Sequence, residues 1–308
     1  MDAVPFLFID CVCRQLCGSD LAEMEQIEVS SSWSNCGFEH YEKRRRLTFA
    51  CQVDGEEVAC FLGELRAPEH REPGSREQID CSGDVASQLR LNCDQISDFR
   101  FNRANFGRVS HVSADKLRRA ILPAIAPFVA NCSWPYFDDV DALQTTLFNA
   151  FKNCPGFKAI SVREQGKESS DFVIRQVELG NVERICLQDR KPITWPEPEK
   201  LGEALETFLR STRFRELSVS GPLPNDFELF KLFLERALAN DLKRDAWISF
   251  GSGTFDENQF GVLHAEYRDN SEELAWRIPN SDLRIVFTHG GFWNPHHSTL
   301  NLEAQNNN

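Results

Sequence analysis

Three cysteines near the amino terminus are the first residues in this sequence whose type and spacing suggest chemistry. Cys11, Cys13 and Cys17 lie within seven positions of one another, and tetrahedral zinc needs four converging ligands of this kind. A helix would place the three thiols on different faces, and no second Cys or His pair follows at zinc-finger spacing. The sequence therefore predicts no metal site here, and it predicts no cofactor.

Histidines and glycines near the carboxyl end have simpler structural interpretations. His289, His296 and His297 lie among Gly and Pro residues, so we expect solvated loop histidines rather than metal ligands. The Gly251-Ser252-Gly253-Thr254 segment follows an expected strand, which is the setting of a phosphate-binding loop. It lacks the Lys-Ser/Thr sequel of such loops, so a tight connection between strand and helix is favoured.

Two charged runs are also typical of helix ends. Asp138, Asp139 and Asp141 precede the apolar stretch 143–151, where carboxylates cap free amides and favour the positive end of the helix dipole. The basic run 43–46 suits the negative end of a helix. No Ser-His-Asp, Cys-His or paired-carboxylate set can be nominated, so the sequence predicts a protein that is not an enzyme. An α/β enzyme stays open as a third class, and it would require a deep pocket with converging titratable groups.

Composition excludes several classes of partner. The chain has 47 acidic and 34 basic residues, and its net charge of -13 disfavours nucleic acid and anionic membranes. The 11 cysteines, among them Cys51, Cys60 and Cys186, suit small buried thiols in a reducing compartment. Asp10 and Arg14 interrupt the first apolar stretch, and no apolar run reaches the roughly 18 residues of a membrane span. We expect a cytoplasmic or nuclear protein.

The elements that would position any functional residue follow a repeating pattern. Four short segments alternate large apolar, small and large apolar residues: 159–162, 184–187, 216–219 and 247–250. Their first apolar positions, Ile160, Ile185, Leu217 and Ile248, are 25, 32 and 31 residues apart. Helical patterns follow these segments in turn, over residues 170–179, 197–210, 226–238 and 256–267. This period predicts an α/β fold, a leucine-rich-repeat-like strand-helix solenoid with a parallel sheet.

One side of this sheet is predicted to be a binding surface. Side chains alternate between the two faces of a strand, so the apolar positions would pack on the helices. The small residues between them would form an exposed row on the opposite face: Ser161, Cys186, Ser218 and Ser249. The repeats resemble leucine-rich repeats in period only, because Ser220-Gly221-Pro222 stands where a ladder asparagine would follow.

The first half of the sequence is predicted to be more varied. Apolar residues at steps of three and four predict a helix over residues 4–17, and alternation predicts a hairpin of residues 47–53 and 57–63. Short strands are expected near Leu89–Leu91 and Phe99–Phe101. A helix from residue 115 is expected to end near Pro123. A strand pair is expected near the carboxyl end, over residues 274–278 and 283–287.

These patterns predict four regions. They are a helical segment at 1–46, a β-rich connecting region at 47–112, a strand-helix repeat domain at 113–302 and a disordered tail at 303–308.

The two ends of the chain carry a family resemblance. Met1-Asp2-Ala3-Val4-Pro5-Phe6-Leu7-Phe8, Trp33 and the closing Trp276-Arg277-Ile278-Pro279-Asn280-Ser281 resemble segments of a nematode-expanded protein family. That family has a divergent F-box-like amino terminus and a leucine-rich-repeat-like carboxyl-terminal region. In the F-box comparison, the apolar positions after the F-box proline correspond to Pro5, Phe6, Ile9, Val12 and Leu16.

The resemblance implies a modular protein-interaction function. The F-box-like helices would dock on the adaptor subunit of a cullin-RING ubiquitin ligase through Pro5, Phe6, Ile9, Val12 and Leu16. The repeats would hold a protein substrate, since solenoids present wide, rigid surfaces. The sequence leaves one alternative open: a solenoid binding protein with no ubiquitin-ligase link, whose amino-terminal helices only cap the apolar end of the repeats.

Overall fold

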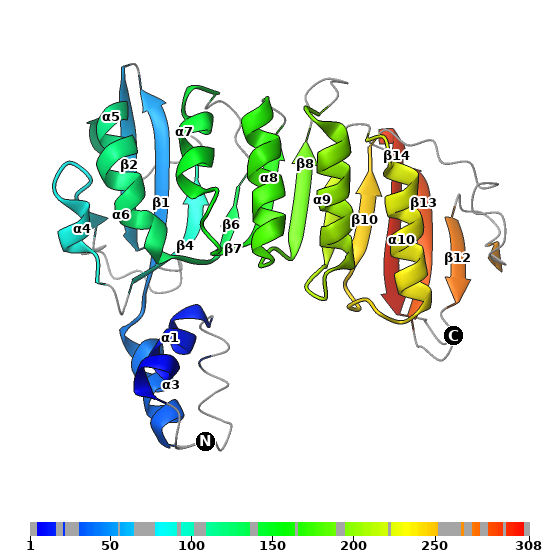
Figure 1. Cartoon of the computed structure of the whole chain (residues 1–308), viewed down its shortest axis with the longest axis horizontal. Coiled ribbons are helices and arrows are strands. Elements are labelled where there is room, and N and C mark those ends of the chain that lie inside the picture. Colours follow the sequence, from blue (N-terminus) through cyan, green and yellow to red (C-terminus); the bar gives the residue numbers. More distant parts are fainter. Residues whose placement is uncertain are drawn as a thin grey trace. The chain divides into compact units, whose positions relative to one another are not determined.

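The computed structural model describes residues 5–16, 21, 31–54, 56–64, 78–90, 94–101, 109–135, 141–163, 166–188, 195–220, 223–251, 266–267, 273–277, 283–291 and 294–304. The chain forms two compact units, Met1–Phe157 and Lys158–Asn308. Each unit combines helices with strands, and the described strands of neither unit close into a barrel (Figure 1). The chain is therefore an α/β protein, and each unit contains parallel strands, as predicted. The start predicted for the repeat domain, residue 113, lies within the first unit.

The first unit begins with two helices, α1 (Phe6–Gln15) and α3 (Ser31–Lys43). They enclose a small core of Ile9, Cys13, Leu21 and Cys36, against which Leu16 and Trp33 pack. The guanidinium of Arg44 closes the end of α1, because it donates hydrogen bonds of 2.6 Å to the carbonyl oxygen of Cys13 and 2.5 Å to that of Leu16. Carbonyl groups in the last turn of a helix have no partner within the helix, so these bonds fix the end of α1.

Strands of the first unit follow in the order β6-β4-β1-β2-β3, and β5 also pairs with β2. Their bounds are β1 (Arg45–Asp54), β2 (Glu57–Glu64), β3 (Gln78–Ile79), β4 (Asp94–Arg100), β5 (Ser110–Ser113) and β6 (Val129–Trp134). The predicted hairpin is confirmed as β1 and β2, which pair antiparallel from Leu47 opposite Glu64 to Asp54 opposite Glu57. Strand β4 runs parallel to both β1 and β6. The strand predicted near Leu89–Leu91 is wrong at Leu89, because this residue is the C-cap of helix α4 (Val85–Gln88).

A run of helical segments leads into β6, and it continues through Pro123 without a break. It consists of α5 (Ala114–Lys116), the π-helical segment η2 (Leu117–Ile121), α6 (Leu122–Ile125) and the 3₁₀ turn η3 (Ala126–Phe128). The prediction that this helix ends near Pro123 is wrong, since Pro123 lies inside α6. Proline is tolerated in the first turn of a helix, and the preceding π segment makes α6 a new start for the hydrogen-bond pattern.

The core of the first unit is aromatic. The ring centroid of Phe99 lies 5.8 Å from that of Phe101, 5.7 Å from that of Trp134, 5.1 Å from that of Phe151 and 5.7 Å from that of Phe157. Phe151 belongs to helix α7 (Asp141–Phe151), so these rings join the helix to the sheet. Large, fully buried rings contribute most to such a core.

Gly156 allows the closest backbone approach in this core. An ideal Cβ atom at this position would lie 2.0 Å from the carbonyl oxygen of Val129 and 2.5 Å from its carbonyl carbon. The carbonyl of Gly156 also accepts a 2.9 Å hydrogen bond from the backbone N–H of Cys132. The turn before Phe157 therefore lies directly against β6, at a distance that only glycine permits.

One buried ion pair joins β1 to β4. Arg45 and Asp94 are partners in the parallel register. The Nε of Arg45 donates to Oδ1 of Asp94, and its Nη2 donates to Oδ2, both at 2.7 Å. Only 9% of the Arg45 side chain and 0% of the Asp94 side chain are exposed to solvent. This geometry is the bidentate type, in which two parallel hydrogen bonds reinforce the attraction of the charges.

The repeating segments of the second half are neighbouring parallel strands, as predicted. They are β7 (Phe157–Arg163), β8 (Arg184–Gln188), β9 (Glu216–Val219) and β10 (Trp247–Phe250). The register places Ile160 opposite Ile185, Ile185 opposite Leu217, and Leu217 opposite Ile248. All four side chains are buried. The equal pattern in the sequence therefore corresponds to one apolar row across four strands.

Helices α8 (Lys167–Leu179), α9 (Pro198–Arg210) and α10 (Asp226–Leu238) connect these strands and lie on the same side of them (Figure 1). Each buries one face, because apolar residues recur at steps of three and four. In α9 this face is Leu201, Leu205, Phe208 and Leu209, as predicted. Helix α8 ends at Gly180, whose φ of 73° is the left-handed conformation that glycine adopts without strain.

Antiparallel strands complete the second unit. They are β11 (Glu266–Tyr267), β12 (Glu273–Arg277), β13 (Leu283–Gly291) and β14 (Asn294–Ala304), in the sheet order β11-β12-β13-β14-β10. The predicted strand pair near the carboxyl end is confirmed as β12 and β13. The helix predicted over 256–267 is wrong at residues 266–267, and the rest of it lies outside the described residues. Residues 303–304, predicted to be part of a disordered tail, end β14.

Candidate functional site

The predicted binding row is a continuous line across the parallel strands. The register places Ser161 opposite Cys186, Cys186 opposite Ser218, and Ser218 opposite Ser249. Ser161, Cys186 and Ser218 are half-buried, but Ser249 is completely buried. The prediction of an exposed residue is therefore wrong for Ser249, and the accessible part of the row ends at Ser218.

A second row of side chains, two of them charged, flanks the first. Ala159, Arg184, Glu216 and Trp247 are register partners across the same four strands. The guanidinium Nε of Arg184 lies 3.8 Å from Oε2 of Glu216. Burial raises the pKa of the Glu216 carboxyl, and the charge of Arg184 acts in the opposite direction. This face of the sheet is thus lined by small and charged residues together with Trp247, a mixture that is common in protein interfaces.

The predicted adaptor-binding residues are found at different depths of the amino-terminal helices. Pro5 is exposed and precedes α1, while Val12 and Leu16 are half-buried. Ile9 is only 1% exposed, because it fills the core between α1 and α3. Its position supports the helices rather than offering a surface for direct contact. Phe6 begins α1, and its side chain lies outside the part that the structure describes.

The most exposed large apolar side chains of the described residues lie on these same two helices. They are Phe8, Phe38 and Tyr41, which are 56%, 52% and 48% exposed. Phe38 and Tyr41 are three residues apart on α3, so they share a helix face. Phe8 of α1 contacts Trp33 edge-on, with ring centroids 6.3 Å apart. Sequence reasoning missed these residues because helical spacing does not tell which of several apolar faces is buried.

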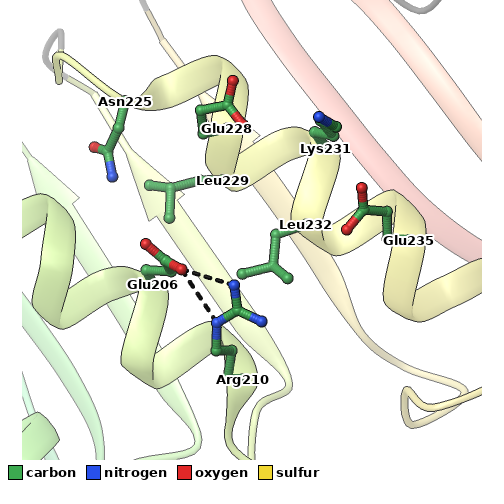
Figure 2. A pocket seen from close by; sticks show the side chains of 8 residues that line it. All are labelled: Glu206, Arg210, Asn225, Glu228, Leu229, Lys231, Leu232 and Glu235. Atoms are coloured by element: carbon green, nitrogen blue, oxygen red, sulfur yellow. Dashed lines mark hydrogen bonds and ion pairs between the residues drawn. The ribbon is translucent and has the colours of Figure 1, made fainter.

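A shallow groove lies between α9 and α10 in the second unit. It has a volume of about 220 Å³ and is lined by Glu206, Arg210, Asn225, Glu228, Leu229, Lys231, Leu232 and Glu235. Figure 2 shows that Glu206 and Arg210 are paired on α9, where the Arg210 Nε and Nη2 donate to Oε1 of Glu206 at 3.1 Å and 2.7 Å. This lining contains three glutamates, a lysine and an arginine, and it contains no serine, threonine, cysteine or histidine.

The start of α10, at one end of this groove, contains a half-buried carboxyl group, that of Asp226. Asp226 accepts a 3.2 Å hydrogen bond at Oδ2 from the backbone N–H of Leu223. Its Oδ1 is buried and has no hydrogen-bond partner among the described residues. Burial raises the pKa of Asp226 to about 7, although the hydrogen bond from Leu223 acts in the opposite direction.

Replacing Asp226 with asparagine is expected to stabilise the protein at neutral and alkaline pH. Since the pKa is raised in the folded state, folding retains a proton that the unfolded chain releases, and stability falls as pH rises from about 4 to about 7. Asp226→Asn removes this loss, so we expect a gain of roughly 1–3 kcal/mol at about pH 8 and a smaller gain at about pH 5. Urea unfolding at both pH values measures the difference.

The control for this experiment is Glu228→Gln in the same first turn of α10, where the carboxylate is exposed. Its effect should stay within about 1 kcal/mol and should not increase with pH in the same way. Equal gains for Asp226→Asn at the two pH values would contradict the assignment of a raised pKa.

The other sequence candidates are dispersed. Cys11 is exposed while Cys13 is buried, and Cys17 lies outside the described residues. The histidines predicted in loops are instead in strands, His289 in β13 and His296 and His297 in β14. The loop expectation is wrong because β13 and β14 pair through this region, with His289 opposite Ser298.

Two further predictions involve residues that the structure describes only in part. Asp138 and Asp139 lie outside the described residues, and Asp141 begins α7. Gly251 follows β10, and the rest of the glycine-rich segment lies outside them.

Three further cysteines of the first unit are buried in or beside the β1–β2 hairpin. Cys51 and Cys60 are opposite each other in the β1–β2 hairpin, and Cys81 is also buried. Burial raises the pKa of Cys60 and of Cys81 to about 12 and also raises that of Cys51. Thiols with such values stay protonated at neutral pH and are poor nucleophiles.

The architecture therefore defines an α/β protein whose accessible features are a polar sheet face, a charged groove between two helices and exposed aromatic residues on two amino-terminal helices. No helix within the described ranges is both long and apolar enough to cross a membrane. Comparisons of the chain with protein-family models, curated proteins and solved structures found no match.

Proposed function

We propose that this chain is a non-enzymatic protein-interaction module, a substrate-recognition adaptor of a cullin-RING ubiquitin ligase. Its amino-terminal helices dock on the adaptor subunit of the ligase, and its strand-helix repeats form a leucine-rich-repeat-like solenoid that holds a protein substrate. The observation that carries the proposal is the exposure of Phe8, Phe38 and Tyr41, all of them on α1 and α3. Exposed aromatic residues that are grouped on one part of a protein mark docking sites, because leaving them in water is unfavourable.

The sheet face supplies the second surface. Ser161, Cys186 and Ser218 form its centre, and Arg184 and Glu216 provide charges beside them. Their half-buried side chains can pair with polar groups of a partner while the apolar row on the helix side keeps the strands rigid. A rigid surface that changes little on binding limits the entropy cost of association.

Binding to a purified ligase adaptor subunit tests the first part of this proposal. The full chain is expected to bind, and a variant carrying Phe8→Ser, Phe38→Ser and Tyr41→Ser is expected to bind roughly tenfold or more weakly, since aromatic anchors dominate interface energies. Because all three side chains are exposed, the variant should keep the circular dichroism of the parent chain. Calorimetric titration measures both affinities.

A matched control is Glu39→Ala, which removes an exposed side chain of α3 without removing an aromatic ring. It should bind as the parent chain does. If the full chain does not bind the adaptor subunit, the ligase link is withdrawn and the alternative of a binding protein with structural amino-terminal helices is favoured. If the triple variant binds as well as the parent chain, the three aromatic residues are not the docking surface.

A further inference from the structure

Four side chains capable of binding a metal lie on α1 and α3, and the ligand atoms of three of them converge. Asp10 and Cys13 lie three residues apart on α1, and Cys36 and His40 lie four residues apart on α3. The ligand atoms of Asp10, Cys36 and His40 all lie within 4.8 Å of one another. The thiol of Cys13 lies outside this group of three, but it is hydrogen-bonded to the thiol of Cys36, which makes it the candidate fourth ligand. Figure 1 shows these two helices side by side.

The cluster is enclosed by the small core of these helices. Cys13 is 0% exposed and Cys36 is 2% exposed, while the side chains of His40 and Asp10 are 5% and 13% exposed. The Nε2 of His40 lies 2.9 Å from Oδ1 of Asp10. Three of the four groups are therefore nearly sealed from water, and the carboxylate lies at the edge, where an ion can enter.

We propose that Asp10, Cys13, Cys36 and His40 form a tetrahedral zinc site that holds α1 against α3. Two sulfurs, one imidazole nitrogen and one carboxylate oxygen are the donor types that zinc takes in structural sites. Calcium and magnesium require a set of oxygen ligands that this cluster does not offer. The paired spacing supports the geometry, since residues three or four apart on a helix point to the same side.

The size of the local core is a second argument. Besides the two cysteines, the described apolar residues that hold these helices are Ile9 and Leu21, with Leu16 and Trp33 packed beside them. Helical segments of this length rarely supply enough apolar burial to be stable, and small domains commonly obtain the remainder from a bound metal. A zinc ion at this position would link the helices by four bonds at the point where their cores meet.

The charges around the cluster also suit a bound zinc ion. Two thiolates and one carboxylate around Zn²⁺ leave one net negative charge, and the guanidinium of Arg44 lies beside the site, where its Nη2 is 3.4 Å from Nδ1 of His40. Zinc binding releases the two thiol protons to solvent. The Nε2 of His40 would bind the metal, and the ring proton would then lie on Nδ1. Arg44 would then give up this long contact and keep its bonds to the backbone of α1.

Zinc uptake by the full chain tests the site. Protein purified with chelator and then exposed to zinc chloride is expected to retain one tightly bound ion per chain after gel filtration, as measured by native mass spectrometry. Replacement of zinc by cobalt(II) should give the sulfur-to-metal absorption of a site with two thiolates. The thermal midpoint should rise on zinc addition and should not change with magnesium or calcium chloride.

Single substitutions assign the ligands. Cys13→Ser and Cys36→Ser are each expected to lower zinc affinity by at least tenfold and to reduce the cobalt–thiolate absorption by about half. The matched control is Cys11→Ser, because Cys11 is exposed on the same helix. This variant should bind zinc as tightly as the unsubstituted chain. Absence of zinc uptake by the unsubstituted chain would overturn the proposal whether or not any variant folds. The proposal would also be overturned if Cys13→Ser, Cys36→Ser and a His40→Ala variant each bound zinc as tightly as the unsubstituted chain.

Discussion

Arg45→Met is expected to lower the free energy of unfolding by about 3–5 kcal/mol, because it leaves the carboxylate of Asp94 buried without its charged partner. Both oxygens of Asp94 are held by Arg45 at 2.7 Å, and the side chain of Asp94 is 0% exposed. The backbone N–H of Arg90 also donates to Oδ2 of Asp94 at 2.7 Å. That bond alone cannot replace the guanidinium. Urea unfolding followed by circular dichroism measures the loss.

A double variant separates the ion pair from the packing of its side chains. Arg45→Met with Asp94→Leu removes both charges and keeps apolar volume, so it should recover most of the stability lost in Arg45→Met. The control is Arg100→Met, which breaks the 2.7 Å pair with Asp98 on the same strand β4. Both side chains of that pair are more than a third exposed, so its loss should cost less than about 1 kcal/mol. If the double variant were no more stable than Arg45→Met, a stranded charge would not be the cause.

Gly156→Ala is expected to produce the second large effect, a loss of about 3 kcal/mol or more, or failure to accumulate as soluble protein. The added methyl carbon would lie 2.0 Å from the carbonyl oxygen of Val129, which is backbone and cannot rotate away as a side chain can. To relieve this clash, the start of β6 would have to move, and the hydrogen bond from the backbone N–H of Cys132 to the carbonyl of Gly156 would be disturbed. Thermal unfolding of the purified variant measures the loss.

Gly83→Ala is the matched control for this substitution. Its new Cβ atom would meet its nearest neighbour, Nε2 of Gln88, at 3.4 Å, which is ordinary van der Waals contact with a flexible side chain. We expect a change within about 1 kcal/mol. If Gly156→Ala were tolerated as well as Gly83→Ala, the turn before Phe157 would have to be more mobile than its packing indicates.

The second unit was the more predictable part of the chain. The repeated segments of its four parallel strands alternate strictly, so the alternation alone assigns Ile160, Ile185, Leu217 and Ile248 to one face of the sheet, and the register agrees. Helix α10 begins and ends where its pattern predicted, at Asp226 and Leu238. Period and alternation are local properties, and here they agree with the tertiary packing.

The errors arose where tertiary structure decided between local alternatives. Pro123 would end an ordinary helix, but the π-helical turn before it lets the chain continue. Ser249 has the same local pattern as Ser218, yet it is completely buried. His289 resembled a loop residue because of the glycines beside it, while pairing of β13 with β14 makes it part of a strand.

The candidate sites were hidden from the sequence for a related reason. Asp10 with Cys13, and Cys36 with His40, each form an ordinary helical pair, and nothing local shows that the two helices place them together. A search for ligand pairs at helical spacing, rather than for zinc-finger spacing, would have found them. The exposure of Phe38 and Tyr41 is likewise a property of packing.

Strand β14 has a consequence for assembly and for the order of synthesis. It pairs antiparallel with β10, from Trp247 opposite Asn301 to Phe250 opposite Ser298, and so occupies the free edge of the parallel series. Another copy of the protein cannot extend the series at β10, which protects against aggregation through open strand edges. Residues 294–304 are synthesised after every other described residue, so the edge of β10 stays unpaired in the nascent chain until they have emerged.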